Sequence, residues 1–213
     1  MKGMRKRRRG MIAARMLFPG ALLALLPGCS ADFSREERRV IAAGEGPMRV
    51  LILGNGEDEA VLRSTSRPVN GGMLRGKTYA TLRRRMLATV RNPENEGVGI
   101  AAPQVGVLRR IIAVQRFDKA GEPFEFFLNP EIIGVSGEKQ AGREGCLSVP
   151  DRYGDVERWQ QIRVRYIDED GEPREEEIAG FTAVIFQHEL DHLDGILYVD
   201  RLAAEQGSGE AGA

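Results

Sequence analysis

Residues 181–193 read FTAVIFQHELDHL, a stretch that contains neither glycine nor proline and is largely apolar. These features predict a buried helix. The only two histidines of the chain, His188 and His192, lie here four residues apart, with Glu189 between them. Because four residues make about one helical turn, both imidazoles project from one face and can bind a single metal ion. The alternative is a pair of helix histidines held by ordinary hydrogen bonds.

Two histidines leave a catalytic metal site one protein ligand short, because such sites usually combine three protein ligands with one water. The only glutamates that follow the helix, Glu205 and Glu210, lie close to the end of the chain. Upstream, residues 144–148 read EGCLS and offer Cys146, whose thiolate is a strong ligand. A cysteine considered alone is more often a small buried apolar residue, but the incomplete pair of histidines favours a ligand role for Cys146.

A glycine-rich segment, GVGIAAPQ, occupies residues 97–104. It lacks the spacing of phosphate-binding loops. A tight loop or bulge is the simplest interpretation. The segment would also let the backbone of a substrate approach closely at Gly99 and Ile100, and Gln104 supplies one amide.

The remaining pattern predicts mostly strands. One helix is expected at residues 79–91, where apolar side chains recur at three- and four-residue steps, and a loop is expected at residues 64–76. Alternation and turn residues predict the following strands: residues 48–53, 111–117, 124–128, 132–135, 162–166 and 174–178. Strands followed by one late helix, without regular alternation of the two, indicate an α+β fold.

The composition excludes several classes of protein. The 213 residues carry 31 Lys and Arg against 31 Asp and Glu, so the net charge of zero predicts no direct binding to nucleic acid. With 42% hydrophobic and 29% charged residues, the chain is neither mainly disordered nor a multi-span membrane protein. Its length fits one domain.

The first 29 residues have the profile of a targeting segment. Residues 1–15 contain seven Lys and Arg and no acid, and the apolar run at residues 16–26 is too short to span a bilayer. The run ends in Leu26-Pro27-Gly28-Cys29, which resembles the lipoprotein box in which the cysteine is acylated. We therefore expect export and membrane attachment through Cys29. The alternative is translation from Met48 and a cytoplasmic protein.

Three segments together resemble the signatures of the peptide deformylase family. They are residues 97–104, residues 144–148, and QHELDHLDG at residues 187–195, in the family's order. The resemblance spans about residues 48–202. It implies an α+β, peptide-deformylase-like fold with antiparallel sheets packed around a central metal-binding helix. Residues 1–29 are then the leader, 30–47 a tether, 48–202 the catalytic domain and 203–213 a flexible tail.

The resemblance also implies a reaction, namely metal-dependent removal of the formyl group from N-terminal formylmethionine of peptides or nascent chains. It implies Cys146, His188 and His192 as metal ligands and Glu189 as the general acid and base. Gln104 and the backbone amide of Leu147 would bind the developing oxyanion.

Substrate specificity is expected to come from the helix that carries the histidines. Phe181, Val184 and Ile185 precede His188 by seven, four and three residues, so they share its face. They are expected to line an apolar slot for a methionine side chain, although a purely structural role in the core is the alternative. Glu144 and Asp191 are candidates for orienting the ligands, or for ordinary salt bridges.

Ligand chemistry and the family resemblance imply different metal ions. Sulfur and imidazole ligands suit Zn²⁺, whereas the resemblance implies Fe²⁺, with Zn²⁺, Ni²⁺ or Co²⁺ able to replace it. Two other functions use the same motif: a zinc endopeptidase, and a surface lipoprotein that keeps the fold without catalysis. The sequence indicates no oligomeric state.

Overall fold

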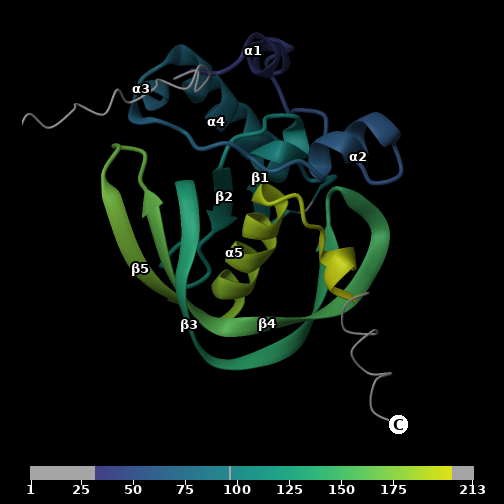
Figure 1. Ribbon diagram of the computed structural model, residues 1–213, viewed down its shortest axis with the longest axis vertical. Coiled ribbons are helices and arrows are strands. Elements are labelled where there is room, and N and C mark those ends of the chain that lie inside the picture. Colours follow the sequence, from purple (N-terminus) through teal and green to yellow (C-terminus); the bar gives the residue numbers. More distant parts are fainter. Residues whose placement is uncertain (1–31, 96, 203–213) are drawn as a thin grey trace, which may run out of the picture.

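The computed structural model describes residues 32–95 and 97–202 (Figure 1). The leader, residues 1–29, and the tail, residues 203–213, therefore lie outside the described residues, and so does Cys29. Among the described helices, none combines the length and the apolar character that a membrane span requires.

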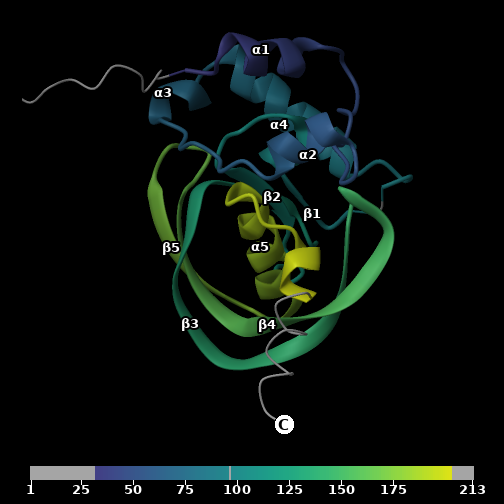
Figure 2. The same ribbon diagram turned by 45° about the vertical axis from the view of Figure 1, so that its right-hand side comes forward.

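Within the described residues, four helices precede the sheet and α5 follows it, and residues 198–202 are helical as well. The helices are α1 (Arg35–Ala42), α2 (Gly56–Leu62), α3 (Gly71–Leu74), α4 (Lys77–Val90) and α5 (Gly180–Leu193), with a 3₁₀ turn η1 at Ala102–Val105. The strands are β1 (Gly99–Ala101), β2 (Ile111–Gln115), β3 (Phe124–Cys146), β4 (Val149–Ile167) and β5 (Pro173–Ala179). Figures 1 and 2 show α1–α4 gathered at one end of the sheet and α5 inside its curve.

The strands form one antiparallel sheet in the order β1-β2-β3-β4-β5. The α+β class and the antiparallel pairing are as predicted, but the strands belong to a single sheet. The long strands β3 and β4 change register at four places along their ladder. Such bulges bend a strand and increase its twist, which allows this pair to wrap around α5 (Figure 2).

Helix α5 is buried, as the sequence predicts, and it forms part of one of the hydrophobic clusters. Phe186 and Leu193 are fully buried, and Phe186 packs edge-on against Phe127 of β3 with 4.5 Å between ring centroids. Gly180 begins the helix at a φ of +64°, a conformation that glycine adopts without strain. A side-chain clamp also holds α5 to the sheet, because Gln187 accepts from the backbone of Trp159 and donates to it, at 3.1 and 2.7 Å.

The predicted tether at residues 30–47 is wrong for its described part. Helix α1 starts with a capping box in which Ser34 and Glu37 satisfy each other's backbone amides. Phe33 and Ile41 are each 1% exposed, and both pack into the core against α4. The carboxylate of Glu37 pairs with the buried Arg109 at 2.9 Å. Residues 32–47 are therefore part of the folded domain.

Helix α4 matches the predicted helix to within two residues at its first end and one at its last. Its arginine run does not form a wholly solvated face, because Arg85 is 4% exposed. The Arg85 guanidinium donates to four backbone carbonyls, those of residues 40, 41, 46 and 47. The end of α1 and the segment that follows it thus cover Arg85. The sequence alone predicts an exposed Arg85 because it does not show this contact.

Residues 48–53 are not a strand, contrary to expectation. Their backbone instead donates to two separate segments, from Leu51 to the carbonyl of Gln104 and from Leu53 to that of Ser148, each at 2.8 Å. This stretch therefore ties together two segments that carry candidate site residues. The expected loop at residues 64–76 contains the short helix α3.

Candidate active site

Three metal-binding side chains from two elements converge at one point. Cys146 ends β3, whereas His188 and His192 lie one turn apart on α5. One ligand atom from each residue lies within 4.8 Å of the others, and Cys146 Sγ is 3.2 Å from His192 Nε2. One thiolate and two imidazoles provide the three protein ligands of an open metal site. The predicted ligand set fits a divalent metal ion.

The electrostatics of the cluster keep the sulfur ionised. Burial opposes ionisation of the Cys146 thiol, but the neighbouring His192 and His188 outweigh it and lower the pKa of Cys146 well below its usual value. The thiolate is the form of cysteine that binds metals.

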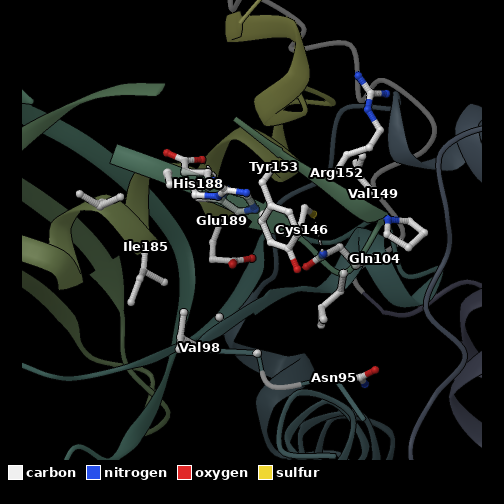
Figure 3. Close-up of a pocket in the computed structure, with 18 of the residues that line it drawn as sticks. Asn95, Val98, Gln104, Cys146, Val149, Arg152, Tyr153, Ile185, His188 and Glu189 are labelled. Atoms are coloured by element: carbon white, nitrogen blue, oxygen red, sulfur yellow. Dashed lines mark hydrogen bonds and ion pairs between the residues drawn. The ribbon is translucent and has the colours of Figure 1, made fainter. Parts of the chain in front are cut away.

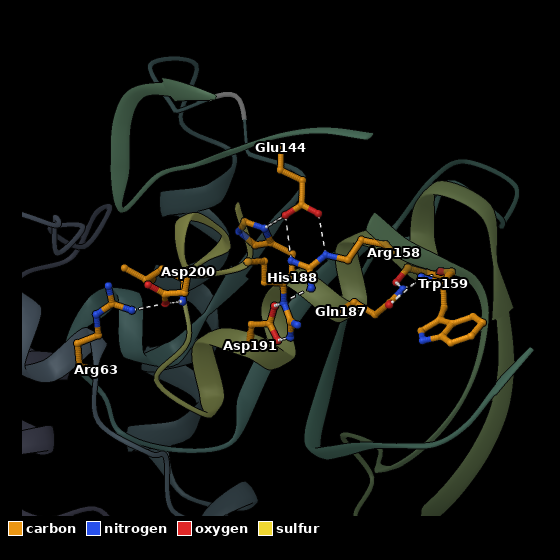
Figure 4. Close-up of polar contacts among 11 residues, drawn as sticks. Arg63, Glu144, Arg158, Trp159, Gln187, His188, Asp191 and Asp200 are labelled. Carbon is orange, nitrogen blue, oxygen red and sulfur yellow. Dashed lines mark hydrogen bonds and ion pairs between the residues drawn. The ribbon is translucent and has the colours of Figure 1, made fainter. Parts of the chain in front are cut away.

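A buried carboxylate orients His188. Glu144 accepts a hydrogen bond from His188 Nδ1 at 2.8 Å, which leaves Nε2 available as a ligand (Figure 4). Arg158 binds both carboxylate oxygens of Glu144, at 2.7 and 3.0 Å. Although burial raises the pKa of Glu144, the hydrogen bonds from His188 and Arg158 lower it to about 2. Glu144 is therefore ionised, and its carboxylate accepts a hydrogen bond from the proposed metal ligand His188.

Asp191 belongs to the same polar network, but its carboxylate accepts from Arg158 and Arg201 and from no proposed metal ligand among the described residues. Arg158 spans from Glu144 to Asp191, which it contacts at 2.6 Å, and Arg201 binds Asp191 from the other side. The sequence predicted a supporting role for Glu144 and Asp191 and did not identify Arg158 as the residue that joins them.

Glu189 points into the cavity beside the ligands (Figure 3). It is 4% exposed, and its Oε2 has no hydrogen-bond partner among the described residues. Burial raises the pKa of Glu189 to about 7, against the opposing effect of the two histidines. A carboxyl group with this pKa can both accept and release a proton near neutral pH.

Gly99 makes room for that carboxylate. A Cβ built on Gly99 would lie 2.4 Å from Glu189 Oε1 and 2.8 Å from a methyl carbon of Ile185. Gly99 lines the cavity as predicted, and its missing side chain also determines where Glu189 can lie. Ile100, the next residue, is fully buried in the core against α4, so its side chain does not reach the cavity. The predicted approach of the substrate backbone at Ile100 stays a prediction.

Gln104 and Leu147 flank the thiolate. Gln104 lies in η1, and its Oε1 accepts from the Ala101 amide at 2.8 Å. This bond directs Nε2 toward Cys146 Sγ at 3.5 Å and Ser148 Oγ at 3.3 Å. Leu147 lies in the two-residue turn from β3 to β4 and lines the cavity. The predicted oxyanion donors therefore share the cavity with Glu189.

The cavity has a volume of about 540 Å³. Phe181, Val184 and Ile185 line one wall, as predicted from their helical spacing. Phe181 is 55% exposed at the mouth and packs against Phe117, with 5.2 Å between ring centroids. These three side chains thus supply apolar surface to the cavity, and Ile185 also packs in the core.

The sequence did not identify several residues at or beside the cavity. Tyr153 lies over Gly145, where a Cβ would meet its ring at 2.6 Å, and Arg143 approaches the same ring to 5.1 Å. Tyr198 is buried and stacks on His188, with 6.2 Å between ring centroids. The β3–β4 register pairs Glu144 with Gly154 and thereby places Tyr153 at the cavity. In the sequence, the turn after Cys146 was the only signal of this placement.

Comparison with known proteins agrees with this geometry. A family model described as polypeptide deformylase matches residues 51–207. The chain is 41% identical over 161 residues to the peptide deformylase of Leptospira biflexa serovar Patoc, covering 72% of this chain and 87% of that one. It is 43% identical over 142 residues to peptide deformylase 2 of Xanthomonas axonopodis pv. citri, covering 67% and 81%.

Solved structures give the same result. The Met-Ala-Ser-bound class I type b peptide deformylase from Acinetobacter baumannii has a TM-score of 0.66 and 40% identity, covering 74% of this chain and 99% of that one. The peptide deformylase from Thermotoga maritima has a TM-score of 0.63 and 36% identity, covering 73% and 97%. The chain therefore belongs to the peptide deformylase family.

Proposed function

We propose that this chain hydrolyses the formamide bond of peptides that begin with formylmethionine, releasing formate and a free N-terminal amine. The observation that carries the proposal is the meeting, in one cavity, of the Cys146, His188 and His192 cluster with the buried Glu189. The family match favours this reaction over the endopeptidase and the non-catalytic alternatives.

Glu189 is the group that moves the proton. A divalent ion, when bound by the three ligands, lowers the pKa of water and acts as a Lewis acid toward the formyl group. The Glu189 carboxylate accepts a proton from the attacking water and then delivers it to the departing amine nitrogen as the C–N bond breaks. Its pKa of about 7 suits both steps.

Fixed donors stabilise the charge that develops on the formyl oxygen. The Gln104 amide is held by its bond from Ala101, so its Nε2 needs no reorientation during the reaction. The backbone N–H of Leu147 is the second proposed donor. Loss of one such donor costs about 2.7–4 kcal/mol of barrier in comparable sites.

The apolar wall beside the cluster holds the methionine side chain. Val184 and Ile185 lie one turn before His188, and Phe181 lies two turns before it. Gly99 lines the cavity beside Ile185 and Glu189. The similar Acinetobacter structure is bound to Met-Ala-Ser, a peptide that begins with methionine, which supports a site for a methionine side chain.

The test is turnover of formyl-Met-Ala-Ser by the parent and by Glu189→Gln. We expect turnover to fall about 10²–10⁴-fold in the variant, the usual contribution of general acid–base catalysis. Glu177→Gln, on exposed β5, is the control. Undiminished turnover in Glu189→Gln contradicts the mechanism, and cleavage of internal bonds in an N-blocked peptide would favour an endopeptidase.

For the metal, we propose Fe²⁺, with Zn²⁺, Ni²⁺ or Co²⁺ as possible replacements. The mixed thiolate and imidazole ligands are compatible with all four ions. Metal analysis of protein purified without oxygen tests the proposal. Zinc at one equivalent with no iron, in a fully active preparation, would contradict it.

For location, we propose export and membrane attachment through an acylated Cys29. The packing of residues 32–47 supports a start upstream of Met48, since a chain beginning there would lose Phe33 and leave Arg109 without Glu37. Such an enzyme would meet formylated peptides outside the cytoplasm. Mass spectrometry of the native N-terminus tests this proposal, and a chain that starts at Met48 would contradict it.

A further inference from the structure

Although the net charge of the chain is zero, two parts of the fold carry net charges of opposite sign. Residues 32–95 contain twelve Arg and Lys against eight Asp and Glu, a net charge of +4. Residues 97–202 contain twelve against twenty, a net charge of −8. The first group forms the end of the molecule built from α1–α4, and the second contains the sheet and α5 (Figures 1 and 2). The protein therefore has a basic end and an acidic end.

Several cations at the basic end face solvent. Arg35 on α1, Arg75 at the end of α3 and Lys77 at the start of α4 are exposed, and none of their side chains has an ion pair or hydrogen bond to another described residue. The opposite side of α1 is buried through Phe33, Glu37 and Ile41. The outward cations are thus not needed to hold α1 on the fold. We call the exposed side of α1, the end of α3 and the start of α4, with Arg35, Arg75 and Lys77, the helical face.

The chain packs against the folded domain from Asp32 onward, close to Cys29, the proposed anchor. The carbonyl of Asp32 accepts from Arg109 at 2.8 Å, and Phe33 is 1% exposed. Cys29 precedes Asp32 by three residues, so their Cα atoms are at most about 11 Å apart. An acyl group on Cys29 would therefore hold the adjoining end of the domain within about 11 Å of the lipid. Charges interact over about 8 Å at physiological ionic strength.

We propose that the helical face rests on the anionic headgroups of the membrane that anchors the protein. This proposal deepens the proposed membrane attachment, and it depends on that attachment for the short distance. The active site stays accessible in this orientation, since its described lining begins at Glu94 and includes no residue of α1–α3. Basic residues near an anionic lipid surface are attracted to it, and salt weakens the attraction.

The experiment uses the full chain purified from membranes, after its N-terminal mass has been measured. The protein is placed on vesicles of phosphatidylcholine, either pure or with about 30 mol% phosphatidylglycerol, and hydrogen exchange of the α1 amides is followed. We expect exchange in α1 to be at least about fivefold slower on the anionic vesicles, and this difference to vanish in about 0.5 M salt. Exchange in β4 should be equal on both.

Two variants with equal charge change make the result specific. Arg35→Glu combined with Arg75→Glu and Lys77→Glu should abolish the protection of α1. The control is Arg163→Glu combined with Arg165→Glu and Arg174→Glu on the exposed sheet, which should keep it. Both variants should retain the parent's turnover of formyl-Met-Ala-Ser to within about twofold, because neither set lines the cavity.

The outcomes separate this proposal from the proposed location. Equal exchange of α1 on both vesicles, or equal loss of protection in both variants, overturns the helical face as a lipid-binding surface. Protection by single-stranded RNA but not by vesicles does so too and favours a nucleic-acid partner. An unacylated N-terminus overturns the proposed anchor alone, and protection of α1 by added anionic vesicles would then support the surface by itself.

Discussion

Replacing Gly99 with alanine tests how closely the active site is packed. The added Cβ would lie 2.4 Å from Glu189 Oε1, 2.9 Å from its Cδ and 2.8 Å from an Ile185 methyl carbon. All three distances are below 3.0 Å, so the Glu189 carboxylate must move by several tenths of an ångström or more. A misplacement of about 1 Å can reduce a rate about 10²-fold. Overpacking of this kind also destabilises a fold by about 1–3 kcal/mol.

The assay compares turnover of formyl-Met-Ala-Ser with urea unfolding of the same preparations. We expect Gly99→Ala to lower kcat about 10²-fold while it remains folded at assay temperature. The matched control is Gly142→Ala, on β3, where an added Cβ meets no atom within 4 Å. A folded Gly99→Ala enzyme whose kcat stays within twofold of the parent would refute the conclusion that this glycine determines the position of Glu189.

Three further predictions address the surrounding structure. Glu144→Gln should weaken metal retention about 10–100-fold because it alters the acceptor that orients a ligand; competition with a chelator measures this, and unchanged retention would contradict it. Glu37→Ala should lower the free energy of unfolding by about 3–5 kcal/mol, since it leaves the buried Arg109 without its carboxylate; urea unfolding measures the loss, and a change below about 1 kcal/mol would contradict the assignment. The hydrogen bond from Arg116 lowers the pKa of Asp118 to about 2, so this carboxylate contributes stability above its unfolded pKa of about 3.9 and loses it as the pH falls toward 2. Arg116→Met should reduce this acid dependence, which urea unfolding between pH 2 and 5 would show, and an unchanged pH profile would count against the pair.

The sequence was most informative where a local period determines the geometry. The spacing of His188 and His192 requires only that residues 181–193 be helical, and an apolar stretch without glycine or proline makes that outcome strongly favoured. Cys146 was identified because two histidines leave a catalytic metal site one protein ligand short. Its position depends on the register of β3 and β4, which no local pattern reveals. The bulges in that ladder, and the return of Tyr153 to the site, were therefore not predictable.

Other errors arose where tertiary contacts decide the outcome. Five of the eight residues 35–42 are Arg or Glu, and only their packing on α4 makes them a stable short helix. The side chain of Ile100 lies in the cluster that contains α4, a placement that the sequence did not show. Arg85 resembles its exposed neighbours in sequence, and only the covering chain shows that its charge is buried against carbonyls.

The order of the sheet has a consequence for synthesis. Because β1 to β5 are neighbours in chain order, each strand can pair with the one made just before it as the polypeptide emerges. Helix α5 comes after every strand, and it alone contributes imidazoles. Until α5 has been made and has docked inside the sheet, Cys146 is without the rings that favour its thiolate form. Metal acquisition is therefore a late event in the maturation of this protein, and a chain truncated before residue 188 would have the strands of the site but no means of loading it.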